Sequence, residues 1–180
     1  MKVVATALPE VLVLEPRVFE DRRGHFFESW NARTFARATG LSVGFVQDNH
    51  SHSVRNVLRG IHYQVVRPQG RLVRVVEGTV LDVAVDLRRS SPKFGRWVST
   101  ELSAENRRQA WIPPGFGHGF LVRSEAATFL YKATEYWIAE HDRSLRWNDP
   151  QLAIDWGVAA PILADRDADA PLLADAEVFP

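Results

Sequence analysis

The chain has 180 residues, no cysteine and a formal net charge of zero at pH 7. This length predicts one domain spanning residues 1–180, and the balanced charge argues against bulk nucleic-acid binding. The absence of cysteine excludes disulfides, thiolate metal sites and a cysteine nucleophile. No apolar run approaches the ~18–20 residues of a membrane span, and residues 1–5 lack the features of a signal peptide. We therefore expect a cytoplasmic protein with no membrane partner.

Short apolar segments separated by glycine and proline dominate the first half of the chain. We expect strands at 11–14, 25–30, 43–47, 57–66 and 72–76. Residues 18–20 lead into a turn at 21–24. Asn31 is a typical N-cap for a short helix that reaches Arg37, and Gly40 is a typical helix stop.

The second half continues with strands at 80–87, 95–102, 108–112, 118–123 and 127–137. Residues 80–87 alternate between an apolar face and a face that carries two aspartates, Asp82 and Asp86. Short strands at this spacing favour an all-β sandwich or barrel, with helix only at 31–39 and in parts of the last forty residues. Segment 113–119 predicts a rigid corner that presents His118. The acidic tail 138–180 contains enough apolar residues to pack on the barrel.

Two neighbouring stretches, 47–51 and 58–64, hold the main candidates for a ligand site. Arg59 and His62 lie among apolar residues of one strand, which favours a cavity; the alternative is a solvated edge strand. Residues three apart lie on opposite faces of an ideal strand. A pocket shared by Arg59 and His62 therefore predicts a bulge at Gly60.

Nineteen of the 22 basic residues are arginine, and several lie close together between 22 and 74. Arginine suits bidentate recognition of phosphate or carboxylate. The alternative is a GC-rich genome that favours arginine codons.

Histidine chemistry leaves metal binding and acid–base catalysis open. His50, His52, His62 and His118 make a three-histidine metal site conceivable, but Gln64 stands two residues after His62 and is a poor ligand. His62 suits a general base near neutral pH. Tyr131 is a candidate acid or a core residue with a satisfied hydroxyl. Asp167 is a candidate partner for a histidine or part of a solvated acidic loop.

Several motifs, in order, resemble those of one family. They are Asp21–Glu28, Phe45–Ser51, Val57–Gln64, Val83–Arg88, Ile112–Phe120, Phe129–Lys132, Arg146–Pro150 and Asp167 with Pro171–Leu173. The chain resembles the dTDP-4-dehydrorhamnose 3,5-epimerase family, metal-free members of the cupin superfamily. The resemblance implies a cofactor-free jelly-roll homodimer. It also implies a nucleotide-linked 4-keto-6-deoxy sugar as substrate and inversion at C3 and C5.

The resemblance also assigns roles to residues. His62 corresponds to the base, Asp167 to the aspartate that orients it, and Tyr131 to the proton donor. Positions for substrate binding fall on Arg23, Glu28, Gln47, Asp48, Asn49, Arg59, Arg71, His118, Trp137, Asp142 and Arg166. Of these, Arg23 and Glu28 are expected to come from the other subunit. Trp137, which is next to Tyr136, falls on the position that stacks on the thymine base. Arg71 departs from the family's lysine, which stabilises the enolate.

Three other functions stay open. The departure at Arg71 is compatible with an epimerase of only C3 or C5, or with a 3,4-ketoisomerase. A sugar-nucleotide-binding cupin without chemistry would bind ligand but would not exchange protons with solvent. A metal-dependent cupin oxygenase would use His50, His52 and His118.

Overall fold

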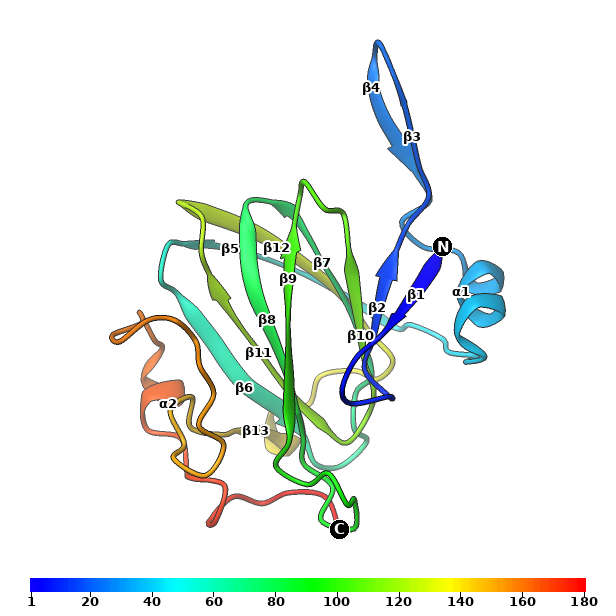
Figure 1. Ribbon diagram of the computed structural model, residues 1–180. Coiled ribbons are helices and arrows are strands. Elements are labelled where there is room, and N and C mark those ends of the chain that lie inside the picture. Colours follow the sequence, from blue (N-terminus) through cyan, green and yellow to red (C-terminus); the bar gives the residue numbers. More distant parts are fainter.

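The computed structural model describes all residues 1–180, and two antiparallel sheets face each other across a common core (Figure 1). The larger sheet has the order β1 (Lys2–Ala5), β2 (Leu12–Glu15), β10 (Gln109–Ile112), β7 (Arg71–Glu77), β12 (Ala126–Ala133) and β5 (Gln47–Val54). The smaller sheet has the order β13 (Asp142–Ser144), β6 (Leu58–Gln64), β11 (Phe116–Val122), β8 (Thr79–Asp86) and β9 (Trp97–Ser103). The predicted all-β jelly-roll architecture is confirmed.

The remaining elements lie outside the two sheets. They are the β3 (Val18–Asp21)–β4 (Gly24–Phe27) hairpin, α1 (Ala32–Thr39), the 3-10 turn η1 (Ala139–His141) and α2 (Asp165–Ala168). The hairpin extends away from the barrel beside the N-terminus (Figure 1). No helix has the length and apolar character needed to cross a membrane.

Apolar side chains fill the space between the two sheets. Val73 and Phe129 from the larger sheet pack with Val80, Ala84 and Phe120 from the smaller sheet. Each large apolar side chain buried in this way contributes about 1.5–3 kcal/mol relative to an exposed one. This core holds the two sheets at a fixed separation, and the polar cavity described below opens beside it.

The acidic tail packs on the barrel, where it covers the outer face of the smaller sheet. Leu145, Trp156 and Leu173 are buried against Val83 and Val85 of β8. Strand β8 is therefore buried on both faces, whereas its alternating sequence gave only one apolar face. The aspartates on its other side point between the sheets and require polar partners there.

Helix α1 covers part of the outer face of the larger sheet. Asn31 Oδ1 accepts hydrogen bonds from two backbone N–H groups of the first turn, and Gly40 ends the helix with a φ of 75°. Phe35 is buried against Trp111 and other apolar residues of that sheet. The predicted cap and stop are confirmed. Asn31 supplies the hydrogen-bond acceptor that the helix start requires, and Gly40 supplies the left-handed conformation that the helix end requires.

Several strand boundaries differ from the predictions. The strand expected at 43–47 is wrong: Val43 and Phe45 pack beside α1, and the strand begins at Gln47. The strands expected at 25–30 and 127–137 end at Phe27 and Ala133. Strands β1 and β13 were not predicted. His118 lies inside β11, not at a corner, because the turn is confined to the residues around Gly115.

Candidate active site

Strand β6 bulges at Gly60. Arg59 pairs with Phe120 and His62 pairs with His118, so Gly60 and Ile61 of β6 oppose the single residue Gly119 of β11. Gly60 has a φ of 125°, and a Cβ on it would lie 2.5 Å from Gly119 Cα. The predicted bulge is confirmed, and only glycine fits there.

The bulge lets Arg59 and His62 line one cavity. This cavity has a volume of about 260 Å³ and lies between the two sheets. Strands β5, β7 and β12 contribute Asn49, Ser51, Arg71, Phe129 and Tyr131 from the larger sheet, and β11 contributes His118 and Phe120. The structure therefore brings together six of the predicted site residues, namely Asn49, Arg59, His62, Arg71, His118 and Tyr131.

His62 is paired with a buried carboxylate. Its Nε2 lies 2.6 Å from Asp167 Oδ1, and the His62 side chain is 25% exposed, whereas that of Asp167 is 2% exposed. Asp167 accepts a second hydrogen bond from Gly60 N–H at 3.2 Å, which the bulge makes available. With Nε2–H donated to Asp167, Nδ1 is the ring nitrogen left to accept a proton. The solvated-loop alternative for Asp167 is wrong.

The charge of Asp167 is held by its surroundings. Burial alone would raise the pKa of Asp167, but hydrogen bonds from His62 and Gly60 and the charge of Arg166 bring the pKa below its ordinary value. Arg166 Nε lies 3.5 Å from Asp167 Oδ1. Ser144, opposite His62 on β13, also lies within 3.4 Å of Oδ1. The carboxylate is thus a fixed negative charge behind His62.

Tyr131 and Arg71 lie on the larger sheet, across the cavity from His62. The Arg71 guanidinium lies 5.6 Å from the centre of the Tyr131 ring. Burial lowers the pKa of Arg71, whose ordinary value is so high that the side chain remains a cation. Arg71 Nη1 also donates to His62 O at 3.4 Å. The cavity therefore has a cation and a phenol on one wall and a basic imidazole on the other.

A second histidine–aspartate pair lies beside the first. His118 Nε2 is 2.7 Å from Asp82 Oδ2, and both side chains are buried. The register of β6 and β11 places His118 directly next to His62. Sequence reasoning missed Asp82, although an aspartate inside an otherwise apolar strand was the available signal. This carboxylate fixes the orientation of His118.

The polar residues near Arg59 come from β5. Arg59 Nε donates to the buried Ser53 Oγ at 3.0 Å. Asn49 Nδ2 is buried without a hydrogen-bond partner, so its two N–H groups are free for a ligand. Sequence reasoning also missed Ser53 and Ser144, since small hydroxyl residues in polar stretches give no distinctive pattern.

Gln47, Trp137, Asp142 and Arg166 lie around this cavity without lining it. Gln47 Oε1 accepts from Trp137 N–H at 2.9 Å. Arg166 Nη1 donates to Asp142 Oδ2 at 2.8 Å. These contacts tie the segment after β12 to β5 and to the tail that carries Asp167.

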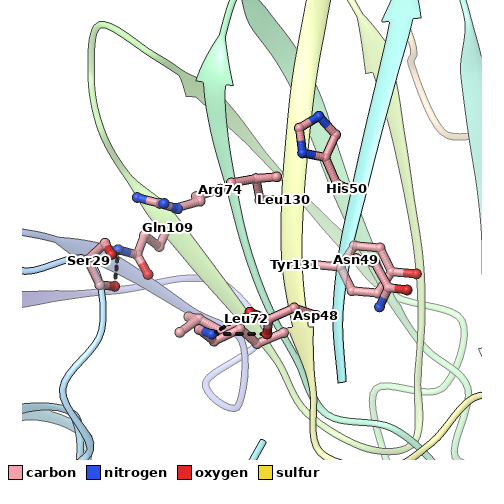
Figure 2. A pocket seen from close by; sticks show the side chains of 10 residues that line it. Ser29, Asp48, Asn49, His50, Leu72, Arg74, Gln109, Leu130 and Tyr131 are labelled. Atoms are coloured by element: carbon pink, nitrogen blue, oxygen red, sulfur yellow. Dashed lines mark hydrogen bonds and ion pairs between the residues drawn. The ribbon is translucent and has the colours of Figure 1, made fainter. Parts of the chain in front are cut away.

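A second cavity, of about 340 Å³, lies on the outer face of the larger sheet (Figure 2). Asp48 lies there and forms an ion pair with Lys132 at 2.9 Å. His50 and His52 are exposed on this same face, whereas Asn49, Ser51 and Ser53 point inward. Asp48 is therefore separated by the sheet from His62, and no three metal-ligating side chains form a cluster.

Arg23 and Glu28 also lie away from the barrel cavity. Arg23 is at the tip of the β3–β4 hairpin, where its guanidinium pairs with Asp21 at 2.6 Å. Glu28 follows the hairpin and accepts from Asn31 Nδ2 at 2.8 Å. Within one chain, neither side chain reaches the cavity that contains His62.

Comparisons with known proteins point to one family. Residues 5–175 match the family described as dTDP-4-dehydrorhamnose 3,5-epimerase. The chain is 58% identical to the dTDP-4-dehydrorhamnose 3,5-epimerase of Pseudomonas aeruginosa, with 100% of both chains covered. It is 39% identical to the dTDP-4-dehydrorhamnose 3-epimerase of Streptomyces niveus, with 98% of this chain and 86% of that protein covered.

One solved structure extends the similarity to three dimensions. It is the dTDP-6-deoxy-D-glucose-3,5-epimerase of Legionella pneumophila in complex with dTDP-4-keto-L-rhamnose. The TM-score is 0.95 at 47% identity, and the alignment covers 98% of this chain and 94% of that chain.

Proposed function

The chain belongs to the dTDP-4-dehydrorhamnose 3,5-epimerase family, and we propose that its barrel cavity carries out the family reaction with His62 as the base. That reaction inverts C3 and C5 of dTDP-4-dehydro-6-deoxy-D-glucose and gives dTDP-4-dehydro-L-rhamnose, in dTDP-L-rhamnose biosynthesis. The proposal depends on one observation: a histidine–aspartate pair faces a tyrosine and an arginine across a single cavity.

The chemistry of the ketone explains the need for this arrangement. A proton on a carbon beside C4=O is acidic because the carbanion left behind delocalises onto the oxygen as an enolate. His62 Nδ1 accepts that proton, and the Asp167 carboxylate stabilises the imidazolium that forms. Arg71 supplies the positive charge at the enolate oxygen. His118, held by Asp82, supplies a further polar contact to the sugar.

Inversion requires a proton from the opposite face of the sugar. Tyr131 suits this role because β12 belongs to the larger sheet and β6, which carries His62, to the smaller one. A sugar held between the sheets therefore has His62 on one side and Tyr131 on the other. At the cavity rim, Arg59 is placed for the diphosphate, and its Ser53 contact limits its rotation.

Isotope exchange tests the whole proposal. The protein is incubated with dTDP-4-dehydro-6-deoxy-D-glucose in D2O, and NMR follows each carbon. Deuterium at both C3 and C5 supports the proposal. Incorporation at one carbon alone would identify a single-site epimerase, the activity for which the Streptomyces niveus relative is named. Binding without any exchange would leave a binding protein.

Replacing Tyr131 with phenylalanine is expected to reduce net inversion by about 100-fold while proton removal falls much less. The variant keeps the ring beside Arg71 and loses only the hydroxyl. Deuterium wash-in, compared with product formation on the same sample, separates the two steps. Equal losses in both rates would show that Tyr131 is not the proton donor.

We further propose a homodimer in which the β3–β4 hairpin of one copy completes the site of the other. The hairpin projects from the barrel (Figure 1), and its Phe26 is 72% exposed. Arg23 can then contact a nucleotide only in a neighbouring molecule. The cytoplasmic location predicted from the sequence stays a prediction.

Mixing two inactive variants tests this exchange. Arg23→Ala and His62→Ala proteins are each assayed alone and after subunit exchange. A mixed dimer keeps one site with an intact His62 and an intact Arg23 from its partner, so recovery of up to about a quarter of wild-type activity is expected. No recovery, with mixed dimers demonstrated by mass, would place Arg23 in its own subunit's site, and full activity of Arg23→Ala alone would place it in neither site.

A further inference from the structure

Three glutamine side chains converge on the four-residue segment that follows β12. Gln69 Nε2 donates to Glu135 O at 2.8 Å. Gln64 Nε2 donates to Tyr136 O at 3.2 Å, and its Oε1 accepts from Ile138 N–H at 2.9 Å. Gln47 Oε1 accepts from Trp137 N–H at 2.9 Å. Each of residues 135–138 thus has one backbone group bonded to a glutamine amide, and we call these three glutamines the amide clamp.

The clamp comes from different parts of the barrel. Gln47 begins β5, Gln64 ends β6, and Gln69 lies just before β7. Gln64 is 2% exposed and makes a third hydrogen bond, to Arg67 O at 2.8 Å, so both N–H donors and the oxygen of its amide have a partner. These hydrogen bonds fix the orientation of the buried Gln64 amide, and the amide in turn fixes the backbone of residues 136 and 138.

The clamped segment carries two aromatic side chains that the fold itself does not bury. Tyr136 is 58% exposed and Trp137 is 52% exposed. Gln69 connects them to the reaction chamber, because its Oε1 accepts from Arg71 Nη2 at 3.2 Å. The same amide therefore holds both the aromatic segment and the cation placed at the enolate.

We propose that Gln64, with Gln47 and Gln69, is a positioning residue that holds the Tyr136–Trp137 segment as a rigid platform for the nucleobase. The proposal rests on the proposed function, since it assumes a nucleotide-linked sugar. It gives Gln64 a role without ligand contact, and it gives Gln47 a contact with the platform in addition to the substrate-binding role that the resemblance implies. Pre-organising the platform removes the cost of ordering an exposed loop when the base stacks.

The test separates nucleobase binding from chemistry. Gln64→Met keeps the length of the side chain and removes all three hydrogen bonds. We expect KM for the sugar nucleotide and Ki for dTDP to rise about tenfold, a part of the stacking energy of one base. We expect kcat for deuterium exchange to stay within about twofold, and Ki for inorganic pyrophosphate to stay unchanged, because pyrophosphate has no base.

Two further variants keep the result interpretable. Gln47→Met removes one clamp bond at the partly exposed end of β5, together with the 2.9 Å bond from Gln47 Nε2 to Asn49 Oδ1. It should raise Ki for dTDP in the same direction, even where Gln64→Met does not fold. Gln151→Met, at an exposed position whose side chain makes no hydrogen bond, is the control and should match the wild type.

Unchanged Ki for dTDP in both clamp variants would overturn the inference, and so would equal increases for dTDP and pyrophosphate. Loss of kcat with unchanged Ki would place Gln64 in the reaction itself and would also overturn it. A wild-type protein that neither binds dTDP nor exchanges deuterium would instead refute the proposed function.

Discussion

Replacing His62 with alanine is expected to slow deuterium exchange at both C3 and C5 by about 100- to 10 000-fold. His62 and His118 each pair with a buried aspartate, but the His62 side chain is 25% exposed and that of His118 only 6%, so His62 is the base that a bound sugar can reach. Alanine also leaves the Asp167 carboxylate without its shortest hydrogen bond, at 2.6 Å. Single-turnover exchange, followed by NMR at each carbon, measures the loss.

His52→Ala is the matched control. His52 is exposed on the outer face of the larger sheet, where its Nδ1 contacts Thr128 Oγ1 at 2.9 Å. It should keep wild-type exchange at both carbons. Exchange that persists at C3 or C5 in the His62 variant would mean that another base serves that carbon, with His118 as the first group to examine.

The elements that a sequence predicts well here are those set by local backbone requirements. Asn31 and Gly40 bound α1 because a helix needs a side-chain acceptor at one end and a left-handed residue at the other. Gly60 follows the same logic. Two polar residues at an odd spacing can share a pocket only if the strand between them is irregular, and the glycine marks the place.

Strand β5 was misplaced because its residues do not have an apolar face. Its inward residues line a polar cavity and its outward residues are exposed, so both faces are polar. The apolar residues just before it, Val43 and Phe45, gave the stronger signal, but they pack on α1 and Trp111 without joining a sheet. A strand that forms the wall of a site lacks the pattern by which strands are found.

The roles of Asp82 and Gln64 could not be predicted for a different reason. Their partners, His118 and residues 136–138, lie far away in the sequence and come close to them only in the folded barrel. The sequence suggested that Gln64 occupies the place of a metal-binding histidine. In the structure its amide forms hydrogen bonds with backbone groups of the neighbouring loops, and these bonds are the reason for a polar residue at this position.

Replacing Asp167 with asparagine is expected to lower kcat by about 100- to 10 000-fold, although the side chains have nearly the same shape. Both carboxylate oxygens of Asp167 accept hydrogen bonds, from His62 Nε2 and from Gly60 N–H. An amide has only one acceptor. If the amide oxygen faces Gly60, the amide NH2 faces His62 and donates to Nε2. The ring then carries its proton on Nδ1, which is the nitrogen that has to accept the substrate proton.

The opposite orientation of the amide is no better for catalysis. Its NH2 then meets the Gly60 N–H, and the imidazolium formed during the reaction has lost its negative partner. Asp169→Asn, an exposed aspartate two residues away, is the control and should leave kcat unchanged. A wild-type rate in Asp167→Asn would show that His62 needs neither the charge nor the tautomer that Asp167 imposes.

The same variant has a stability signature with a defined direction. The pKa of Asp167 is lower in the folded chain than its ordinary value. The carboxylate therefore stabilises the folded state above about pH 4 and loses this contribution as the pH falls further. Asp167→Asn should lower Tm at pH 7, and its difference from the wild type should shrink toward pH 3. A difference in Tm independent of pH would mean that the loss comes from altered packing and not from the charge that holds His62.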